Sequence, residues 1–147
     1  MRRLLVLVVA AAVMVSGYIH FYLYFRGGYR GIAPESFLGL TISRSFALNA
    51  IAALVIAEVL VLTLRYERMM AIVTLGAVGF AISTLVAYTL TRTTGLLGFS
   101  DDQTNTEAII AVTAEIVALI GGVGILVTSR SSASGRSLLS TGSGTSA

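Results

Sequence analysis

Four long apolar runs, separated by short polar joints, occupy most of this 147-residue chain. They cover residues 4–25, 45–64, 69–91 and 106–128. An α-helix rises about 1.5 Å per residue, so roughly 20 apolar residues cross the ~30 Å hydrocarbon layer of a bilayer. The runs therefore predict an all-α fold, a four-helix transmembrane bundle whose helices run up, down, up and down.

The segments outside the runs are too short to form a water-soluble domain. Residues 1–130 are predicted to form one transmembrane domain, and residues 131–147, rich in Ser, Gly and Thr, a disordered tail. The first run follows Met1-Arg2-Arg3, as in a secretory signal peptide. Its apolar character continues for a full membrane length, which favours retention over cleavage. We expect a multi-pass plasma-membrane protein.

The distribution of arginine predicts the orientation of the bundle. Threading the chain four times through a bilayer divides the arginines into two groups. One side carries Arg2, Arg3, Arg65, Arg68, Arg130 and Arg136, and the other carries Arg26, Arg30, Arg44 and Arg92. Cytoplasmic segments carry the excess of positive charge. Both termini are therefore predicted to be cytoplasmic, and the joints around residues 27–43 and 93–105 to lie outside.

Composition excludes several kinds of site. Charged residues make up only 12% of the chain, against about a quarter in soluble domains. The absence of cysteine and the single histidine exclude disulfide frameworks, thiolate metal sites, iron–sulfur clusters and bis-histidine haem. The arginines lie at the ends of the runs, which is typical of membrane anchoring rather than of nucleic-acid binding. We expect no cofactor and no metal, with the lipid bilayer as a partner.

A few polar residues within the runs share helical faces with small residues, and such faces pack against neighbouring helices. His20 shares a face with Gly17, and Glu115 shares one with Ala111 and Ala118. The predicted pocket in the outer half of the bundle consists of His20, Asn49, Ser83, Tyr88 and Glu115, below a cationic rim of Arg26, Arg30 and Arg92. These groups form either a binding or proton-coupled site, or a hydrogen-bond network that only holds the helices together.

Two carboxyl groups within the runs need separate explanations. A charged carboxylate in mid-membrane costs about 3 kcal/mol. Glu115 is therefore expected to be protonated, or paired with His20 or with a rim arginine. Glu58 lies nine residues from Asn49 and so on the opposite face of the same helix, among large aliphatic residues. It is expected to be protonated, to contact Thr74, or to meet another subunit of a homo-oligomer or a larger membrane complex.

Several short motifs carry a resemblance to known proteins. They are Tyr18-Ile19-His20-Phe21-Tyr22-Leu23-Tyr24, Gly28-Tyr29-Arg30, Phe46-Ala47-Leu48-Asn49, Gly95-Leu96-Leu97-Gly98-Phe99 and the pair Glu107 and Glu115. The chain resembles small four-span membrane proteins of high-GC bacteria, a resemblance that implies the fold but no mechanism. Its size and span number are also similar to those of DoxX-like membrane proteins, which is a likeness of fold alone.

The short joints, the lack of cofactor ligands and the small-residue helix faces favour a non-enzymatic accessory or scaffold subunit that acts by helix association. The alternative is a binder or transporter of a small amphipathic or anionic molecule that passes the rim arginines. A lipid-modifying enzyme ranks third. His20 and Glu115 can form an acid–base pair, but no nucleophile or metal-ligand set accompanies them.

Overall fold

The computed structural model describes residues 2–33, 35–66, 69–101 and 105–140. The predicted all-α, four-helix fold is confirmed. The helices are α1 (Arg2–Phe25), α2 (Ile42–Leu62), α3 (Met70–Thr93) and α4 (Thr106–Ser140). Each of them is long and apolar enough to cross a membrane.

The helix boundaries differ in places from the predicted runs. α2 begins before residue 45, because the Thr41 side chain accepts a hydrogen bond of 3.2 Å from the Arg44 N–H. α4 begins at the predicted residue, where the Asn105 side-chain oxygen accepts the Ala108 N–H at 2.8 Å. α4 also continues to Ser140, into the segment predicted to be disordered, because extending an existing helix adds one hydrogen bond per residue. Residues 141–147 of that predicted tail lie outside the described residues.

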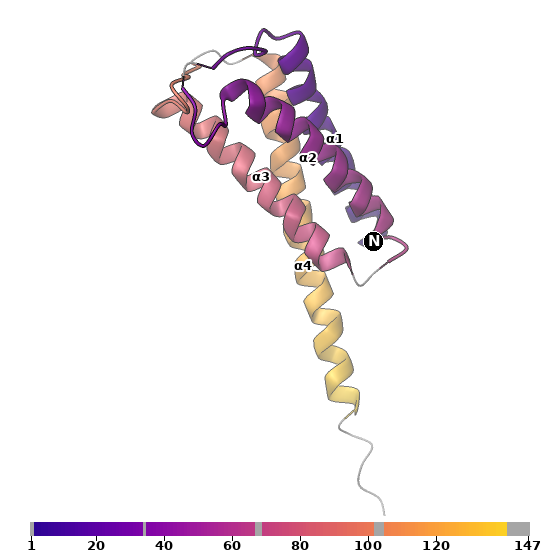
Figure 1. The fold of residues 1–147 in the computed structure, drawn as a ribbon. Helices are drawn as coiled ribbons and strands as arrows, with labels where there is room; N and C mark the ends of the chain where they lie inside the picture. Colours follow the sequence, from indigo (N-terminus) through magenta and orange to yellow (C-terminus); the bar gives the residue numbers. More distant parts are fainter. Residues whose placement is uncertain (1, 34, 67–68, 102–104, 141–147) are drawn as a thin grey trace, which may run out of the picture.

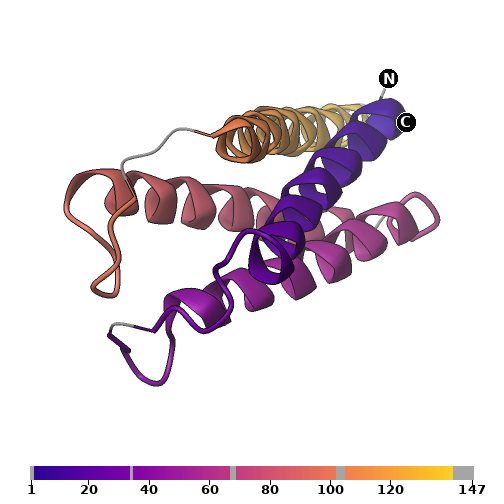
Figure 2. The ribbon, with the colours of Figure 1, turned by 90° about the horizontal axis from the view of Figure 1, so that it is seen from above.

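The described residues of the two long joints, 26–33 with 35–41 and 94–101 with 105, lie at one end of the bundle, which we call the loop end (Figure 1). The N-terminus and the short α2–α3 joint lie at the opposite end. α1 packs most extensively against α2 and α4, and α4 also packs against α3. Seen from above, α1 lies between α2 and α4 (Figure 2). α2 also packs against α3, but this interface is less extensive than the other three.

Small residues let the helices approach one another closely. A Cβ atom added to Gly17 of α1 would overlap the Cβ atom of Ala53 on α2. A Cβ atom added to Gly122 of α4 would lie 2.6 Å from a methyl carbon of Val78 on α3. Both contacts would be closer than van der Waals contact, so a larger residue at Gly17 would force α1 and α2 apart, and one at Gly122 would require the Val78 side chain to shift. The predicted close approach at Gly17 is therefore confirmed.

Each long joint contains a tight turn of the same geometry. Residues 37–40 and residues 96–99 close with paired backbone hydrogen bonds of 2.8–3.0 Å. Leu38 and Leu97 both have φ of 52°, and each is followed by a glycine with positive φ. A left-handed backbone costs a residue with a Cβ atom roughly 1–2 kcal/mol. The second turn brings Phe99 beside Tyr29, where the two joints meet.

Candidate functional site

A cavity of about 110 Å³ lies within the loop end of the bundle. All four helices and both long joints contribute to its wall, so it forms only when the whole bundle is assembled. Four of the five predicted pocket residues line it. The polar and charged lining residues include His20, Asn49, Thr84, Tyr88, Arg92 and Glu115.

Ser83, the fifth predicted residue, is exposed and does not line the cavity. Its hydroxyl donates a hydrogen bond of 2.8 Å to the Phe80 carbonyl of its own helix. Gly76 and Gly79, which are at helical spacing from Ser83, are also exposed, and a Cβ atom added to either would meet nothing within 4 Å. The next residue, Thr84, is buried and reaches the cavity instead.

Glu115 is 2% exposed, and its partner is a residue that the sequence did not single out. The Ser16 hydroxyl of α1 donates a hydrogen bond of 2.9 Å to Oε1 of Glu115. Ser16 is fully buried. The predicted partners were His20 or a rim arginine. The observed hydrogen-bond partner is instead a neutral hydroxyl. The bond joins α1 to α4 at the inner end of the cavity.

The turn of α1 that begins at Ser16 also orients His20. Its Nδ1 atom lies 2.8 Å from the Ser16 carbonyl oxygen and 3.5 Å from the Ser16 hydroxyl oxygen. A carbonyl oxygen only accepts, so Nδ1 must carry the hydrogen and donate. When the ring is neutral, its Nε2 atom is therefore left as an acceptor. The ring packs against Phe46 with centroids 5.3 Å apart.

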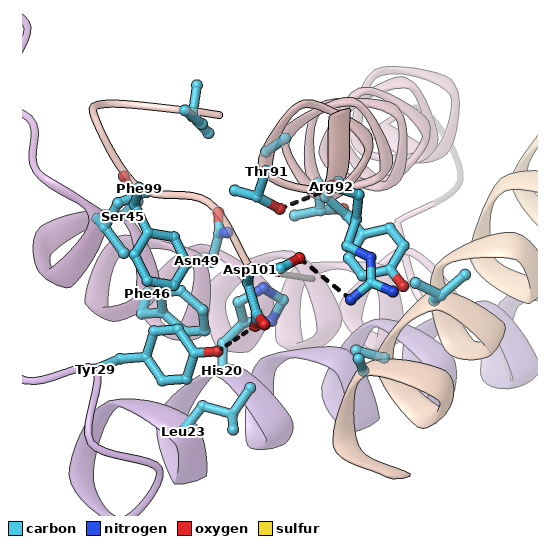
Figure 3. Close-up of a pocket in the computed structure, with 18 of the residues that line it drawn as sticks. His20, Leu23, Tyr29, Ser45, Phe46, Asn49, Thr91, Arg92, Phe99 and Asp101 are labelled. Carbon is cyan, nitrogen blue, oxygen red and sulfur yellow. Dashed lines mark hydrogen bonds between the residues drawn. The ribbon is translucent and has the colours of Figure 1, made fainter. Parts of the chain in front are cut away.

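The rim of the cavity is formed by Tyr29, Asp101 and Arg92 (Figure 3). The Tyr29 hydroxyl donates to Oδ2 of Asp101 at 2.8 Å, which joins the first long joint to the second. Arg92 Nη1 donates to the Asp101 carbonyl oxygen at 3.2 Å. The Arg92 guanidinium also lies 5.7 Å from the centre of the Tyr88 ring. The rim therefore carries both signs of charge.

The other two predicted rim arginines are placed elsewhere. Arg26 and Arg30 are exposed and do not line the cavity. The Arg30 guanidinium lies 6.0 Å from the centre of the Phe25 ring. Both follow the end of α1 at Phe25. Of the predicted cationic rim, the cavity wall contains Arg92 alone.

Tyr29 closes the cavity on the side of the loop end. Its ring stacks on Phe46, with centroids 4.4 Å apart, and meets the edge of Phe99 at 5.7 Å. Burial raises the pKa of the Tyr29 hydroxyl to about 12, and the hydrogen bond to the Asp101 carboxylate and its charge add to this effect. Neither Tyr29 nor Asp101 was a predicted site residue, and no sequence spacing links them.

We expect the Tyr29–Asp101 hydrogen bond to stabilise the protein fully below pH 10 and to lose that effect as the pH rises toward about 12. The reason is that a tyrosine in the unfolded chain ionises near its ordinary pKa of 10.0, whereas folded Tyr29 retains its proton until about 12. Ultraviolet absorbance of tyrosinate checks this. The wild-type titration minus that of Tyr29→Phe should show one tyrosine that ionises late. A difference curve centred near pH 10 would contradict the prediction.

A second hollow of about 500 Å³ adjoins the cavity at the loop end, and we call it the vestibule. The cavity and the vestibule share several lining residues, which are Leu23, Tyr29, Phe99, Asp101 and Asn105. Tyr22 and Glu107 also line the vestibule. The Tyr29–Asp101 pair therefore lies at the boundary between an open outer hollow and a smaller inner one.

Glu58 lies on the opposite side of α2 from the cavity. It is exposed, as are Ile51, Leu54 and Val55 near it on the helix. The Thr74 hydroxyl is buried and has no hydrogen-bond partner in the described part of the chain, so Glu58 makes no hydrogen bond with it. The predicted contact with another subunit stays a prediction.

Comparisons with protein-family models, with curated proteins and with solved structures found no match to this chain. The resemblance to four-span proteins of high-GC bacteria and to DoxX-like proteins therefore stays a prediction.

Proposed function

We propose that this protein is a multi-pass plasma-membrane protein that binds a small polar molecule in the cavity at the loop end. The observation that carries the proposal is a nearly completely buried carboxyl group, Glu115, in the wall of a cavity to which all four helices contribute. Buried ionisable groups in membrane helices are costly and mark sites of function by default. The excess of arginine at the opposite end favours an orientation in which the cavity faces the outside, with both termini cytoplasmic.

The arrangement of the polar groups favours binding over packing alone. If they only held the helices together, His20, Asn49 and Glu115 would be expected to satisfy one another directly. Instead they border a space of about 110 Å³. Sites for drug-sized ligands measure roughly 300–1,000 Å³. We therefore expect a ligand of only a few heavy atoms.

Filling the cavity tests the proposal. Ala87 lines the cavity, whereas its neighbour Val86 is exposed. We expect wild-type protein in nanodiscs, equilibrated with a pool of cellular small molecules and then washed, to retain at least one compound that Ala87→Phe does not retain. Val86→Phe adds the same ring to the outer surface of the same helix and should bind like wild type. Mass spectrometry identifies and quantifies the compound. Equal retention by all three proteins, or by none, would contradict the proposal.

A second function, as an accessory or scaffold subunit, is favoured by Glu58. An acidic side chain on the apolar outer face of α2 is costly in lipid, and a hydrogen bond across a subunit interface would relieve this cost. The occupant that we propose is a second copy of this chain.

We expect Glu58→Leu to weaken self-association about tenfold, because interhelical hydrogen bonds in membranes contribute about 1–2 kcal/mol. Cross-linking in nanodiscs over a range of protein-to-lipid ratios measures this. Ile51→Leu, on the same exposed face, serves as the control and should associate like wild type. An unchanged oligomer distribution in Glu58→Leu would remove the support for this function.

A further inference from the structure

We infer that the ligand of the cavity is a small organic cation that carries N–H groups, such as an amidinium or alkylammonium ion. This inference rests on the proposed binding function and specifies the class of ligand. It replaces the anionic ligand that the three predicted rim arginines suggested.

The route into the cavity favours cations. The vestibule wall includes the carboxyl groups of Asp101 and Glu107, and its described lining residues contain no arginine. Arg26 and Arg30, which were expected to attract anions, do not line it. A hollow lined by one sign of charge concentrates counter-ions of the other sign. Cations are thus drawn to the boundary at Tyr29 and Asp101, and anions are repelled.

The inner end of the cavity offers acceptors for a cation. Glu115 accepts a hydrogen bond from the Ser16 hydroxyl at Oε1, and a carboxylate offers about four acceptor positions in total. A cation would supply the counter-charge that a hydroxyl does not supply, and N⁺–H groups form short, strong hydrogen bonds to carboxylates. Neutral His20 adds its Nε2 atom as an acceptor, because its Nδ1 atom donates to Ser16.

Aromatic rings and the balance of charge in the wall agree with this class of ligand. The rings of Tyr29, Phe46 and Tyr88 line the cavity, and aromatic side chains of this kind line most sites for small organic molecules. Arg92 is the one arginine among the described lining residues. It is held at the rim by the Asp101 carbonyl and lies over Tyr88. A cation that binds Glu115 would stabilise the charged form of this carboxyl group, and the wall would then carry two carboxylates, Asp101 and Glu115, against this one arginine.

Acetamidinium, acetamide and acetate test the inference, because they have nearly the same planar shape and differ in charge. Titration calorimetry on purified protein in nanodiscs, at neutral pH, measures their binding. We expect acetamidinium to bind at least about tenfold more tightly than acetamide, and acetate to bind most weakly. Glu115→Gln should weaken acetamidinium binding by about tenfold or more. Glu58→Gln makes the same substitution on the outer face of α2, away from the cavity, and should have no effect on binding.

Asp101→Asn provides a second variant at the loop end, outside the helices, in case Glu115→Gln fails to assemble. We expect it to weaken acetamidinium binding by a few-fold through the lost charge of the vestibule. Tighter binding of acetate or acetamide than of acetamidinium would overturn the cation inference and leave the proposed function standing. The absence of saturable binding for all three probes would also overturn the cation inference. The proposed function is tested separately, by the compounds that Ala87→Phe and Val86→Phe retain. Acetamidinium binding that survives both Glu115→Gln and Asp101→Asn unchanged would overturn it as well.

Discussion

Gly17→Leu is expected to lower the free energy of unfolding by about 3 kcal/mol. The Cβ atom of any larger residue at this position would overlap the Cβ atom of Ala53, so α1 and α2 would have to move apart. α1 packs against both α2 and α4, so this displacement would disturb two interfaces at once. Reversible unfolding in bicelles or mixed micelles, followed by the loss of helix–helix contact, measures the change.

Gly76→Leu is the matched control for Gly17→Leu. Gly76 also lies within a helix, but a Cβ atom added there meets nothing within 4 Å. The same substitution should therefore change the unfolding free energy by no more than about 0.5 kcal/mol, and the better helix propensity of leucine favours a small gain. If both variants lose the same unfolding free energy, the α1–α2 contact at Gly17 is not the cause of the loss.

Ser16→Ala is expected to lower the free energy of unfolding by about 2 kcal/mol. The substitution removes the hydroxyl that donates to Glu115 and leaves a buried carboxyl group without that partner. The change in volume is small, so the cost comes chiefly from the lost hydrogen bond. The same unfolding measurement applies, with binding of the cavity ligand as a second readout. Both should be impaired, because the carboxyl group that loses this partner also lines the cavity.

Ser83→Ala serves as the control for Ser16→Ala. Ser83 is exposed and donates only within its own helix, so its loss should change stability by no more than about 0.5 kcal/mol. Adding Glu115→Leu to Ser16→Ala provides a further check. Once the carboxyl group is gone, the removal of Ser16 should cost much less than it does alone. If Ser16→Ala lowers the free energy of unfolding equally in the presence and absence of Glu115, the Ser16–Glu115 hydrogen bond does not have the proposed stabilising role.

The fold was predictable because the number of apolar residues in each run matches the thickness of a bilayer. The inward orientation of His20, Asn49 and Glu115 followed from small neighbours at helical spacing. The same rule failed for α3, where Gly76 and Gly79 lie on the exposed face. A stripe of small residues shows that close approach is feasible, but it does not show that a partner helix is present.

The rim of the site was not predictable, because its contacts join distant parts of the chain. Tyr29 and Asp101 are separated by 72 residues, and both lie in joints without helical periodicity. Taken alone, Tyr29 is typical of an aromatic residue at the membrane interface, and Asp101 is typical of a solvated loop residue. Ser16 is 99 residues from Glu115, so their hydrogen bond could not be predicted for the same reason. Only its spacing of four residues from His20 was a usable signal.

Thiol modification in intact cells tests whether the cavity in the bundle is reached from the loop end, with that end outside as proposed. The chain has no cysteine, so Asn49→Cys and Ile51→Cys each introduce a unique thiol on α2. Asn49 lines the cavity, and Ile51 lies at similar depth on the exposed face. A small, membrane-impermeant thiol reagent added outside is predicted to modify Asn49→Cys and to leave Ile51→Cys unmodified. Failure to modify Asn49→Cys, or equal modification of both variants, would show that the cavity is not reached from the outside at the loop end.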